Sequence, residues 1–157
     1  MKKILFILII LYSNIYANKI NNNFYKFDSF FKESSKKYKI PFILLKAIAL
    51  TENTTYNKKV IRKNKNKTKD YGLMQINTIW LKEFKLSEKE ILKPWINIDT
   101  SARILYSLIN KYGYNWDTIG RYHSSTKKYK NIWLNRIKNN MKKIIRYDYK
   151  NNYKIKY

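Results

Sequence analysis

The stretch that decides the fold is Ile40-Pro-Phe-Ile-Leu-Leu-Lys-Ala-Ile-Ala-Leu-Thr-Glu52-Asn53, an apolar run that ends at a single acid. Pro41 stands where a helix favours a proline in its first turn. The residues that follow are apolar on nearly every side, which predicts a buried helix over residues 41–52. Because a lone carboxylate in apolar surroundings is costly, the place of Glu52 at the end of this helix indicates a function.

Several segments around this stretch carry the periodicity of amphipathic helices. Apolar residues recur at helical spacing in residues 26–38, 75–84 and 131–146, and a short helix is expected over residues 115–122. Ser87 begins a capping-box pattern that opens a short helix. Asp99 or Thr100 is placed to cap a longer helix, which Gly113 ends. These patterns predict a mainly helical domain.

Residues 57–71 depart from the helical pattern. Two short runs, Val60-Ile61-Arg62 and Thr68 to Tyr71, flank the polar residues Asn64-Lys65-Asn66. Alternating runs around a polar turn predict a small exposed β-hairpin. The fold class expected from the sequence is therefore mainly α, of the α+β type, with one helical domain and a small β-hairpin beside Glu52.

The N-terminal residues 1–17 have the composition of a secretory signal peptide. A basic start precedes nine apolar residues, Ile4 to Tyr12, and a polar stretch then ends at Ala17. The run is shorter than the roughly 20 residues that span a bilayer, so no stable membrane span is expected. An uncleaved anchor is the alternative, because Ile15 is not small. In either case we expect export to the periplasm, with the domain at residues 18–147 and a basic flexible tail at 148–157.

The charge of the chain is strongly positive, with 34 Lys and Arg against 10 Asp and Glu and a net charge of +24. Such a field favours polyanionic partners, namely nucleic acid, anionic membrane or an acidic cell-wall polymer. A compositional bias toward Lys, Asn and Ile is the alternative explanation. Export argues against nucleic acid as a partner. The chain has no cysteine, so its core alone must hold the fold.

Glu52 is the only acid placed at the end of a buried helix, and it is the candidate catalytic residue. Cleavage of a glycosidic bond needs a carboxylic acid that stays protonated near neutral pH, and burial is a simple way to achieve this. The remaining acids lie in polar or exposed-looking stretches or at a helix cap: Asp28, Glu33, Glu83, Glu88, Glu90, Asp99, Asp117 and Asp148. The alternative for Glu52 is an ordinary acid at a frayed helix end.

The segment Lys69-Asp70-Tyr71-Gly72-Leu73-Met74-Gln75-Ile76-Asn77 supplies what a sugar-binding cleft needs. Gly72 allows a backbone to come close to a ligand. The amide of Gln75 can both donate and accept hydrogen bonds, and Met74 offers a pliable apolar wall. We therefore expect this segment to face Glu52 across a cleft.

Two further segments complete a resemblance to a known family: Thr118-Ile119-Gly120-Arg121-Tyr122-His123-Ser124-Ser125 and Asn97-Ile98-Asp99-Thr100-Ser101-Ala102. With the two stretches above, they make the chain similar to the lysozyme-like soluble lytic transglycosylases, which cut the sugar backbone of bacterial peptidoglycan. The resemblance covers about residues 38–137. A Tyr-His-Ser segment is typical of the specialised members that serve secretion and conjugation systems.

The resemblance implies a reaction and a set of site residues. The bond cut is the β-1,4 link between N-acetylmuramic acid and N-acetylglucosamine, the product is a 1,6-anhydro sugar, and Glu52 acts first as acid and then as base. Neither metal nor cofactor is implied. Tyr122 is expected to reach toward Glu52 and the substrate, and Asn97 to order its loop or border the cleft. The residues expected to bind or position substrate are Gln75, Tyr122, Met74, Asn53, Asn97 and Asp70.

Some residues depart from the family pattern. Asn53 replaces the usual Ser after the acid, and His123 replaces the commoner Asn. Ser101 and Ser125 stand where Gly is usual. A lone histidine is more often structural than catalytic, so His123 is expected to be structural.

Asp70 leaves a second reaction open. Its segment also resembles that of the c-type lysozymes, in which the equivalent Asp is a second catalytic carboxylate. A retaining hydrolase places its two carboxyls about 5–5.5 Å apart. The absence of cysteines and the Tyr-His-Ser segment favour the transglycosylase. The sequence is also compatible with an inactive glycan-binding scaffold and with a membrane-disrupting protein that acts through the basic helix 131–146.

Overall fold

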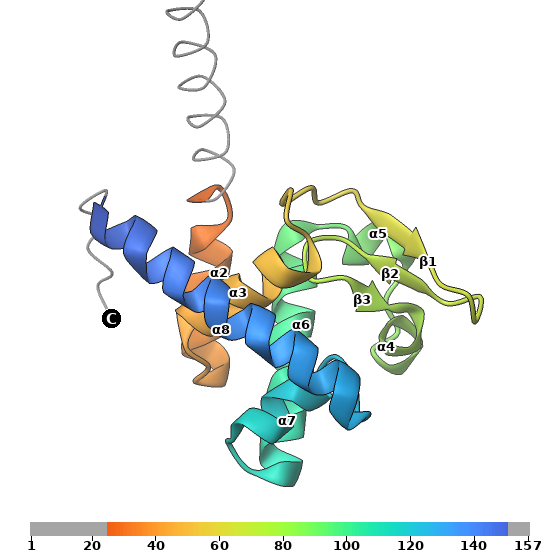
Figure 1. Cartoon of the computed structure of the whole chain (residues 1–157). Coiled ribbons are helices and arrows are strands. Elements are labelled where there is room, and N and C mark those ends of the chain that lie inside the picture. The colour runs from red at the N-terminus through yellow and green to blue at the C-terminus, as the bar shows by residue number, and fades with distance from the viewer. Residues whose placement is uncertain (1–24, 151–157) are drawn as a thin grey trace, which may run out of the picture.

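The computed structural model of the protein describes residues 25–150, with side chains up to residue 148. Helices surround one core, and a three-stranded antiparallel sheet lies to one side of them (Figure 1). This arrangement confirms the predicted mainly α fold with a small β excursion. The predicted signal peptide at 1–17 lies outside the described residues. None of the helices in the described part has both the length and the apolar character needed to cross a membrane.

Helix α3 (Phe42–Glu52) is the buried centre of the domain, as its sequence predicted. Leu45, Ala47 and Ile48 are fully buried, and each fully buried Leu or Ile contributes about 1.5–3 kcal/mol. Pro41 is the N-cap residue of this helix rather than its first turn. Helix α8 (Lys127–Lys150) packs along α3, and in Figure 1 it crosses in front of it. Glu52 therefore ends its helix beside α8.

Helix α8 is longer than its periodicity predicted. The sequence indicated residues 131–146, but the helix begins at Lys127 and ends at Lys150. The start of the predicted flexible tail, at residue 148, is thus helical, and Asp148 is buried. Its carboxylate accepts a hydrogen bond of 2.8 Å from the hydroxyl of Tyr25. This contact joins the two ends of the described chain and ties the last turns of α8 to the domain.

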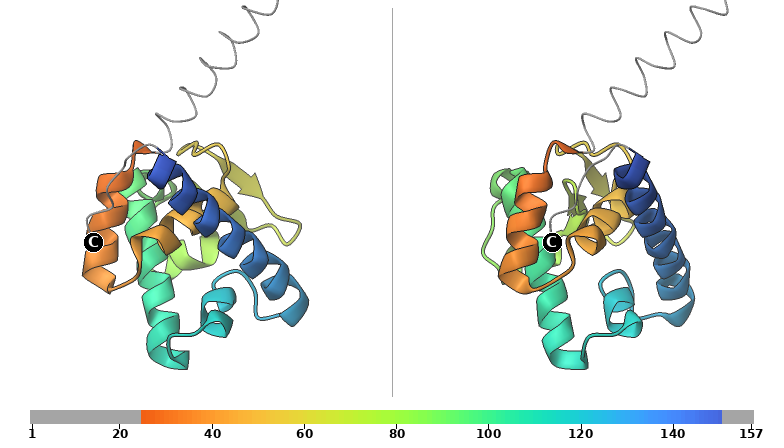
Figure 2. Two further views of the ribbon diagram at one scale, coloured as in Figure 1. Left: turned by 60° about the vertical axis from the view of Figure 1, so that its left-hand side comes forward. Right: turned by 90° about the vertical axis from the view of Figure 1, so that its left-hand side faces the viewer.

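Helices α2 (Asp28–Tyr38) and α6 (Pro94–Tyr112) lie side by side on the opposite side of the domain from α8 (Figure 2). The predicted cap of α6 at Asp99 or Thr100 is wrong, because the helix already begins at Pro94. Asp99 instead accepts hydrogen bonds from Lys37 and Tyr38, at 2.8 and 3.1 Å, and so joins α6 to α2. The predicted end of this helix at Gly113 is confirmed.

A buried ion pair contradicts the prediction that Asp28 is exposed. The Asp28 carboxylate lies 2.8 Å from the ammonium of Lys46, the one cation of α3, and both side chains are buried. Burial raises the pKa of Asp28 and lowers that of Lys46. A lysine in an otherwise apolar helix requires an anionic partner, and this pairing brings the start of α2 onto α3.

The sheet confirms the predicted hairpin and adds a strand to it. Strands β1 (Ile61–Lys63), β2 (Lys69–Tyr71) and β3 (Ile76–Asn77) pair in the order β1-β2-β3, and all pairs are antiparallel. The turn between β1 and β2 contains no glycine, and Lys67 is the residue of this turn with a left-handed backbone conformation, with φ of 66°. Asp70 is paired with Asn77 in register.

The third strand corrects the prediction of a helix from residue 75. Ile76 and Asn77 are extended, and helix α4 (Thr78–Glu83) begins only after them. The side chain of Asn77 accepts a hydrogen bond from the backbone of Ile79, and a residue in this capping role stands outside the helix. The apolar residues keep the spacing of a helix from β3 into α4. Spacing alone therefore did not show that the helix begins after Asn77, where the cap lies.

Two short helices complete the domain. Helix α5 (Glu88–Ile91) has the predicted capping box, in which the side chains and backbones of Ser87 and Glu90 bond reciprocally. Helix α7 (Trp116–Arg121) is capped by Asn115. Helix α7 packs between α6 and α8, so the segment after it, with Tyr122 and His123, arrives opposite the end of α3.

Candidate active site

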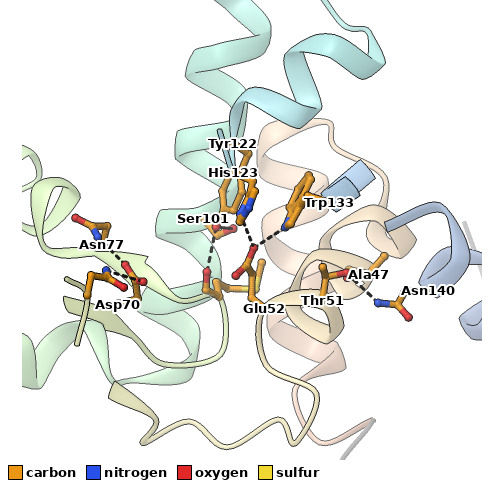
Figure 3. A network of polar contacts seen from close by, with 12 residues as sticks. Ala47, Thr51, Glu52, Asp70, Asn77, Ser101, Tyr122, His123, Trp133 and Asn140 are labelled. Atoms are coloured by element: carbon orange, nitrogen blue, oxygen red, sulfur yellow. Dashed lines mark hydrogen bonds and ion pairs between the residues drawn. The ribbon is translucent and has the colours of Figure 1, made fainter. Parts of the chain in front are cut away.

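Glu52 is the last residue of α3, and one of its two carboxylate oxygens is held by α8. The indole nitrogen of Trp133 donates a hydrogen bond of 2.6 Å to Oε1, and Nδ1 of His123 lies 3.7 Å from the same atom (Figure 3). The Glu52 side chain is 15% exposed. Its other oxygen, Oε2, accepts no hydrogen bond from any residue that the structure describes. One oxygen is thus fixed in place, and the other is available to a ligand.

A second contact fixes α8 at the end of α3. The side-chain amide of Asn140 donates to the hydroxyl of Thr51, which itself donates to the carbonyl of Ala47, at 2.9 and 2.7 Å (Figure 3). Because Thr51 directly precedes Glu52, this chain of hydrogen bonds holds the two helices in register where Trp133 meets the carboxylate. The orientation of Glu52 therefore depends on α8.

An aromatic cluster covers the same end of the site. The rings of His123 and Trp133 are nearly parallel, at 4° and 5.5 Å between centroids, and Tyr122 stacks against Trp133 at 5.9 Å. His123 is thus placed against the acid as well as against the indole. The expectation that His123 is merely structural misses its contact with Glu52.

Tyr122 does not bond to Glu52, in contrast to the expectation that it reaches toward the acid. Its hydroxyl lies 2.9 Å from the hydroxyl of Ser101 and donates to the carbonyl of Met74 at 3.2 Å. Burial raises the pKa of this phenol, so it stays protonated and able to donate. Tyr122 therefore joins α6 to the loop before β3, and Ser101, at a usual glycine position, supplies one of its partners.

A cavity of about 330 Å³ opens in front of these residues, between the helices and the sheet. Its wall is formed by Glu52, Asp70, Gln75, Ile76, Asn77, Trp80, Ile104, Tyr122 and His123. The structure thus brings together four of the seven predicted site residues, which come from α3, β2, the loop after β2 and the end of α7. Within the described residues, no three His, Cys, Asp or Glu side chains gather as a metal site would require.

Asp70 lies on the sheet side of this cavity, apart from the cluster around Glu52 (Figure 3). Each of its oxygens accepts a hydrogen bond from a side-chain amide, from Asn64 at 2.9 Å and from Asn77 at 2.6 Å. Two donated hydrogen bonds suit an ionised carboxylate, which only accepts. The arrangement therefore presents a fixed negative charge opposite the acid.

The loop between β2 and β3 turns sharply at Gln75, whose φ is 48°. The amide nitrogen of Gln75 donates to the carbonyl of Gly72 at 2.7 Å, while its Oε1 is buried with no partner among the described residues. An unmade hydrogen bond to a buried acceptor costs about 1–3 kcal/mol. Gln75 lines the cavity, so this unsatisfied acceptor lies in the residue layer behind the cavity surface.

Three predicted substrate-binding residues lie in the interior and not on the cavity. Met74, Asn53 and Asn97 are buried; Asn97 bonds to backbone groups, and Asn53 bonds to backbone carbonyls and accepts from the hydroxyl of Thr55. Asn97 accepts from the amide of Met74 at 2.7 Å and donates to the carbonyls of Tyr71 and Ile91 at 2.9 and 3.0 Å. These three residues therefore do not line the cavity. They shape the loop that carries Gln75, and Asn97 does so from within α6, where it has no loop of its own to order.

Asn53 holds the same loop from the side of α3. Its amide nitrogen donates to the carbonyls of Asn57 and Gly72, at 2.8 and 3.3 Å. The structure gives a further reason for glycine at position 72, beside the predicted approach to a ligand. A Cβ at this position would lie 2.7 Å from Nδ2 of Asn97, so the close neighbour of Gly72 is the asparagine.

The comparison with known families agrees with this geometry. A family model described as the transglycosylase SLT domain matches residues 29–147 of the chain, from α2 into α8. The chain belongs to the transglycosylase SLT domain family. The resemblance seen in the sequence is thereby confirmed, and the elements that build the cavity all lie within the matched residues of the SLT domain.

Individual proteins similar to this SLT domain come from enteric bacteria. Protein IpgF of Shigella flexneri is 36% identical over 98 residues, which are 60% of this chain and 64% of that protein. Invasion protein IagB of Salmonella typhimurium (strain SL1344) is 35% identical over 116 residues, 66% of this chain and 72% of that protein. A peptidoglycan-binding-like protein of Escherichia coli O157:H7 is 34% identical over 104 residues, which are 60% of this chain and 62% of that protein. The chain thus covers less than two thirds of the length of IpgF.

Sequence reasoning did not assign Trp133, Trp80 or Ile104 to the site of the SLT domain. Trp133 falls within the last helix predicted at 131–146, and Trp80 within the helix predicted over 75–84. A signal was present for Trp133, since a buried indole N–H usually finds an acceptor. Its partner could not be found from spacing, because Glu52 and Trp133 are 81 positions apart.

We expect Trp133→Phe to lower kcat of the SLT domain about tenfold to a hundredfold and to change KM less. Phenylalanine keeps the stacking on Tyr122 but removes the hydrogen bond that orients Oε1 of Glu52. Steady-state rates on purified peptidoglycan measure the effect. Trp116→Phe is the matched control, because Trp116 is exposed and does not line the cavity. Equal rates for both variants would contradict an orienting role for the indole.

Proposed function

We propose that this SLT domain is a peptidoglycan lytic transglycosylase that cuts the β-1,4 bond between N-acetylmuramic acid and N-acetylglucosamine. One observation carries the proposal: Glu52 has one oxygen fixed by Trp133 and the other open to a cavity lined by polar groups. A general acid must be both oriented and accessible to the atom that it protonates. Membership of the SLT family supports the reaction type.

The proposed reaction uses Glu52 twice. In the first step, the protonated carboxyl donates its proton to the glycosidic oxygen, and the bond from that oxygen to C1 of the muramic acid breaks. In the second step, the 6-hydroxyl oxygen of the same sugar attacks C1, and its proton passes to the Glu52 carboxylate. The products are a 1,6-anhydro end and a free 4-hydroxyl, and no water is consumed. An internal nucleophile held in place replaces water.

The other cavity residues support this chemistry through position and charge. The positive charge that develops at C1 in the transition state is stabilised by the fixed carboxylate of Asp70. The side-chain amide of Gln75, which lines the cavity, turns to bond a sugar hydroxyl or an N-acetyl amide. Tyr122 and Ser101 hold the wall on which the sugar rests.

The runner-up is a hydrolytic muramidase in which Asp70 is the second catalytic carboxylate. The observation that favours it is the position of Asp70 on the same cavity, with both oxygens held by amides. Mass spectrometry of soluble products from purified peptidoglycan tests the two reactions. Anhydro ends, one water lighter than reducing ends, support the transglycosylase, and reducing ends support the hydrolase. No products from folded protein would favour an inactive glycan-binding scaffold.

Asp70→Asn separates the two reactions further. For the transglycosylase we expect anhydro products at a rate lowered about tenfold to a hundredfold, because the variant removes charge stabilisation but leaves the acid and the nucleophile. For the hydrolase, the loss of the nucleophile would lower the rate as far as Glu52→Gln does. The same mass spectra, quantified over time, give both product identity and rate.

Localisation and partners are part of the same proposal. We propose that the protein is exported and acts in the periplasm, where it opens the wall for a secretion or conjugation apparatus. One similar protein is named an invasion protein, and another is named peptidoglycan-binding-like. The exposed face of α8 adds positive charge that suits an anionic wall, with Lys128, Lys138, Lys142 and Lys143 on it. A deletion strain that secretes and conjugates normally would contradict this role.

A further inference from the structure

A second cavity, larger than the first, lies outside the catalytic site. Its volume is about 550 Å³, within the range of ligand pockets. It lies between α2 and α6 and extends to the turn that follows α4. Figure 2 shows α2 and α6 side by side along this face, with α8 on the other side of the domain. None of the residues that line this cavity takes part in the proposed reaction.

The charged side chains of this cavity are of both signs, and two of them are free. Lys37 and Asp99 are paired with each other at 2.8 Å. Glu33 and Arg103 also line the cavity, and neither has an ion-pair partner among the described residues. The guanidinium of Arg103 stacks over the ring of Phe84, 4.2 Å from its centroid. A stacked guanidinium keeps its donors in a fixed fork that matches a carboxylate.

An exposed aromatic side chain borders the same cavity. Trp95 is 49% exposed, although indoles are among the side chains that gain most from burial. It contacts Phe30, with 6.1 Å between ring centroids. An aromatic surface beside one free cation and one free anion suits a ligand that carries both charges and apolar parts.

The second cavity adjoins the catalytic one through two pairs of residues. Trp80 lines the catalytic cavity and stacks on Phe84, which lines the second, with 5.7 Å between centroids. On α6, Ile104 faces the catalytic cavity while its neighbour Arg103 faces the second. The two cavities therefore share a boundary, which a chain attached to a sugar in the catalytic cavity crosses to enter the second.

From these observations we infer that the cavity between α2 and α6 binds the peptide stem attached to the muramic acid of the substrate. The inference rests on the proposed function. A peptide stem is a short zwitterionic chain, with free carboxylates for Arg103 and a free amino group for Glu33. A neutral sugar would not use the two charges, and a polyanion would be repelled by Glu33. The cavity thus selects glycan strands that carry uncleaved peptides.

The test compares two substrates and two kinds of measurement. Rates are measured on glycan strands with their peptides and on the same strands after an amidase has removed them. We expect Arg103→Gln to lower the ratio of the two rates about tenfold, as the loss of one charge-assisted hydrogen bond predicts. Glu33→Gln should also lower this ratio of rates, and Arg103→Lys should keep a ratio between those of Arg103→Gln and the wild type. Arg136→Gln, an equal loss of charge on the exposed face of α8, should keep the ratio.

Direct binding separates this inference from the proposed function. A synthetic stem tetrapeptide with a free diamino acid is titrated into wild-type protein and Arg103→Gln by calorimetry. Binding by the wild type that weakens about tenfold in the variant supports the peptide site, even if no strand is cut. Strand cleavage without peptide binding, or an unchanged ratio for Arg103→Gln, would overturn the site and leave the reaction standing. Equal losses on both substrates would assign the cavity to sugar and also overturn the inference.

Discussion

Glu52→Gln is expected to abolish lysis, lowering kcat on peptidoglycan by about 10²- to 10⁴-fold, the contribution of general acid and base catalysis. The amide has the size of the carboxyl group, and its oxygen can still accept the hydrogen bond from the Trp133 indole. What it cannot do is give a proton to the glycosidic oxygen or take one from the 6-hydroxyl. Product release from purified peptidoglycan, followed over time, measures the loss.

The loss must come from chemistry and not from unfolding. The variant should keep the thermal midpoint of the wild type within about 2 °C and sediment with peptidoglycan as the wild type does, because no buried contact is lost. Glu83→Gln is the matched control, since this acid is exposed at the end of α4, away from the cavity. Substantial activity of Glu52→Gln would assign the proton donor elsewhere, with Asp70 as the next residue to change.

The sequence was sufficient to place Glu52 at the end of a buried helix and to predict the general fold. An apolar helix that ends at Glu52 is a local pattern, and the capping box at Ser87 and the stop at Gly113 are local as well. Each depends on neighbouring residues, so each could be predicted. The sheet was predicted only in part. Asn77 belongs to β3 and also caps α4, and the spacing of apolar residues does not show where a strand passes into a helix.

The contacts that define the site were not local and could not be predicted. Trp133 meets Glu52 only because α8 packs on α3, and Tyr25 meets Asp148 across the whole described chain. Charge provided a weak signal that was not used. Lys46 is the one cation in an apolar helix, and it implied a buried acid such as Asp28. A residue type therefore indicates that a partner is needed, while only the fold identifies the partner.

Asn97→Ala is expected to be the most destabilising single change near the site, lowering the free energy of unfolding by about 3–5 kcal/mol. It removes three buried hydrogen bonds, so the amide of Met74 loses its side-chain acceptor and the carbonyls of Tyr71 and Ile91 lose the Asn97 donor. The total free energy of unfolding of a domain of this size is about 5–15 kcal/mol. Thermal and urea unfolding followed by circular dichroism measure the loss. Asn135→Ala, on the exposed face of α8, is the control and should change stability by less than about 0.5 kcal/mol.

A double-mutant cycle with Gly72→Ala shows what the asparagine does to the loop. Alone, Gly72→Ala is strained for two reasons: φ is +74°, and the new Cβ would lie 2.7 Å from Nδ2 of Asn97. In the Asn97→Ala background the contact with Nδ2 disappears, while the strain of the positive φ remains. The double variant should therefore be more stable than the sum of the two single losses predicts, by at least about 0.5 kcal/mol. Additive losses would mean that backbone conformation alone requires the glycine, and that Asn97 does not set how closely the loop of Gln75 approaches α6.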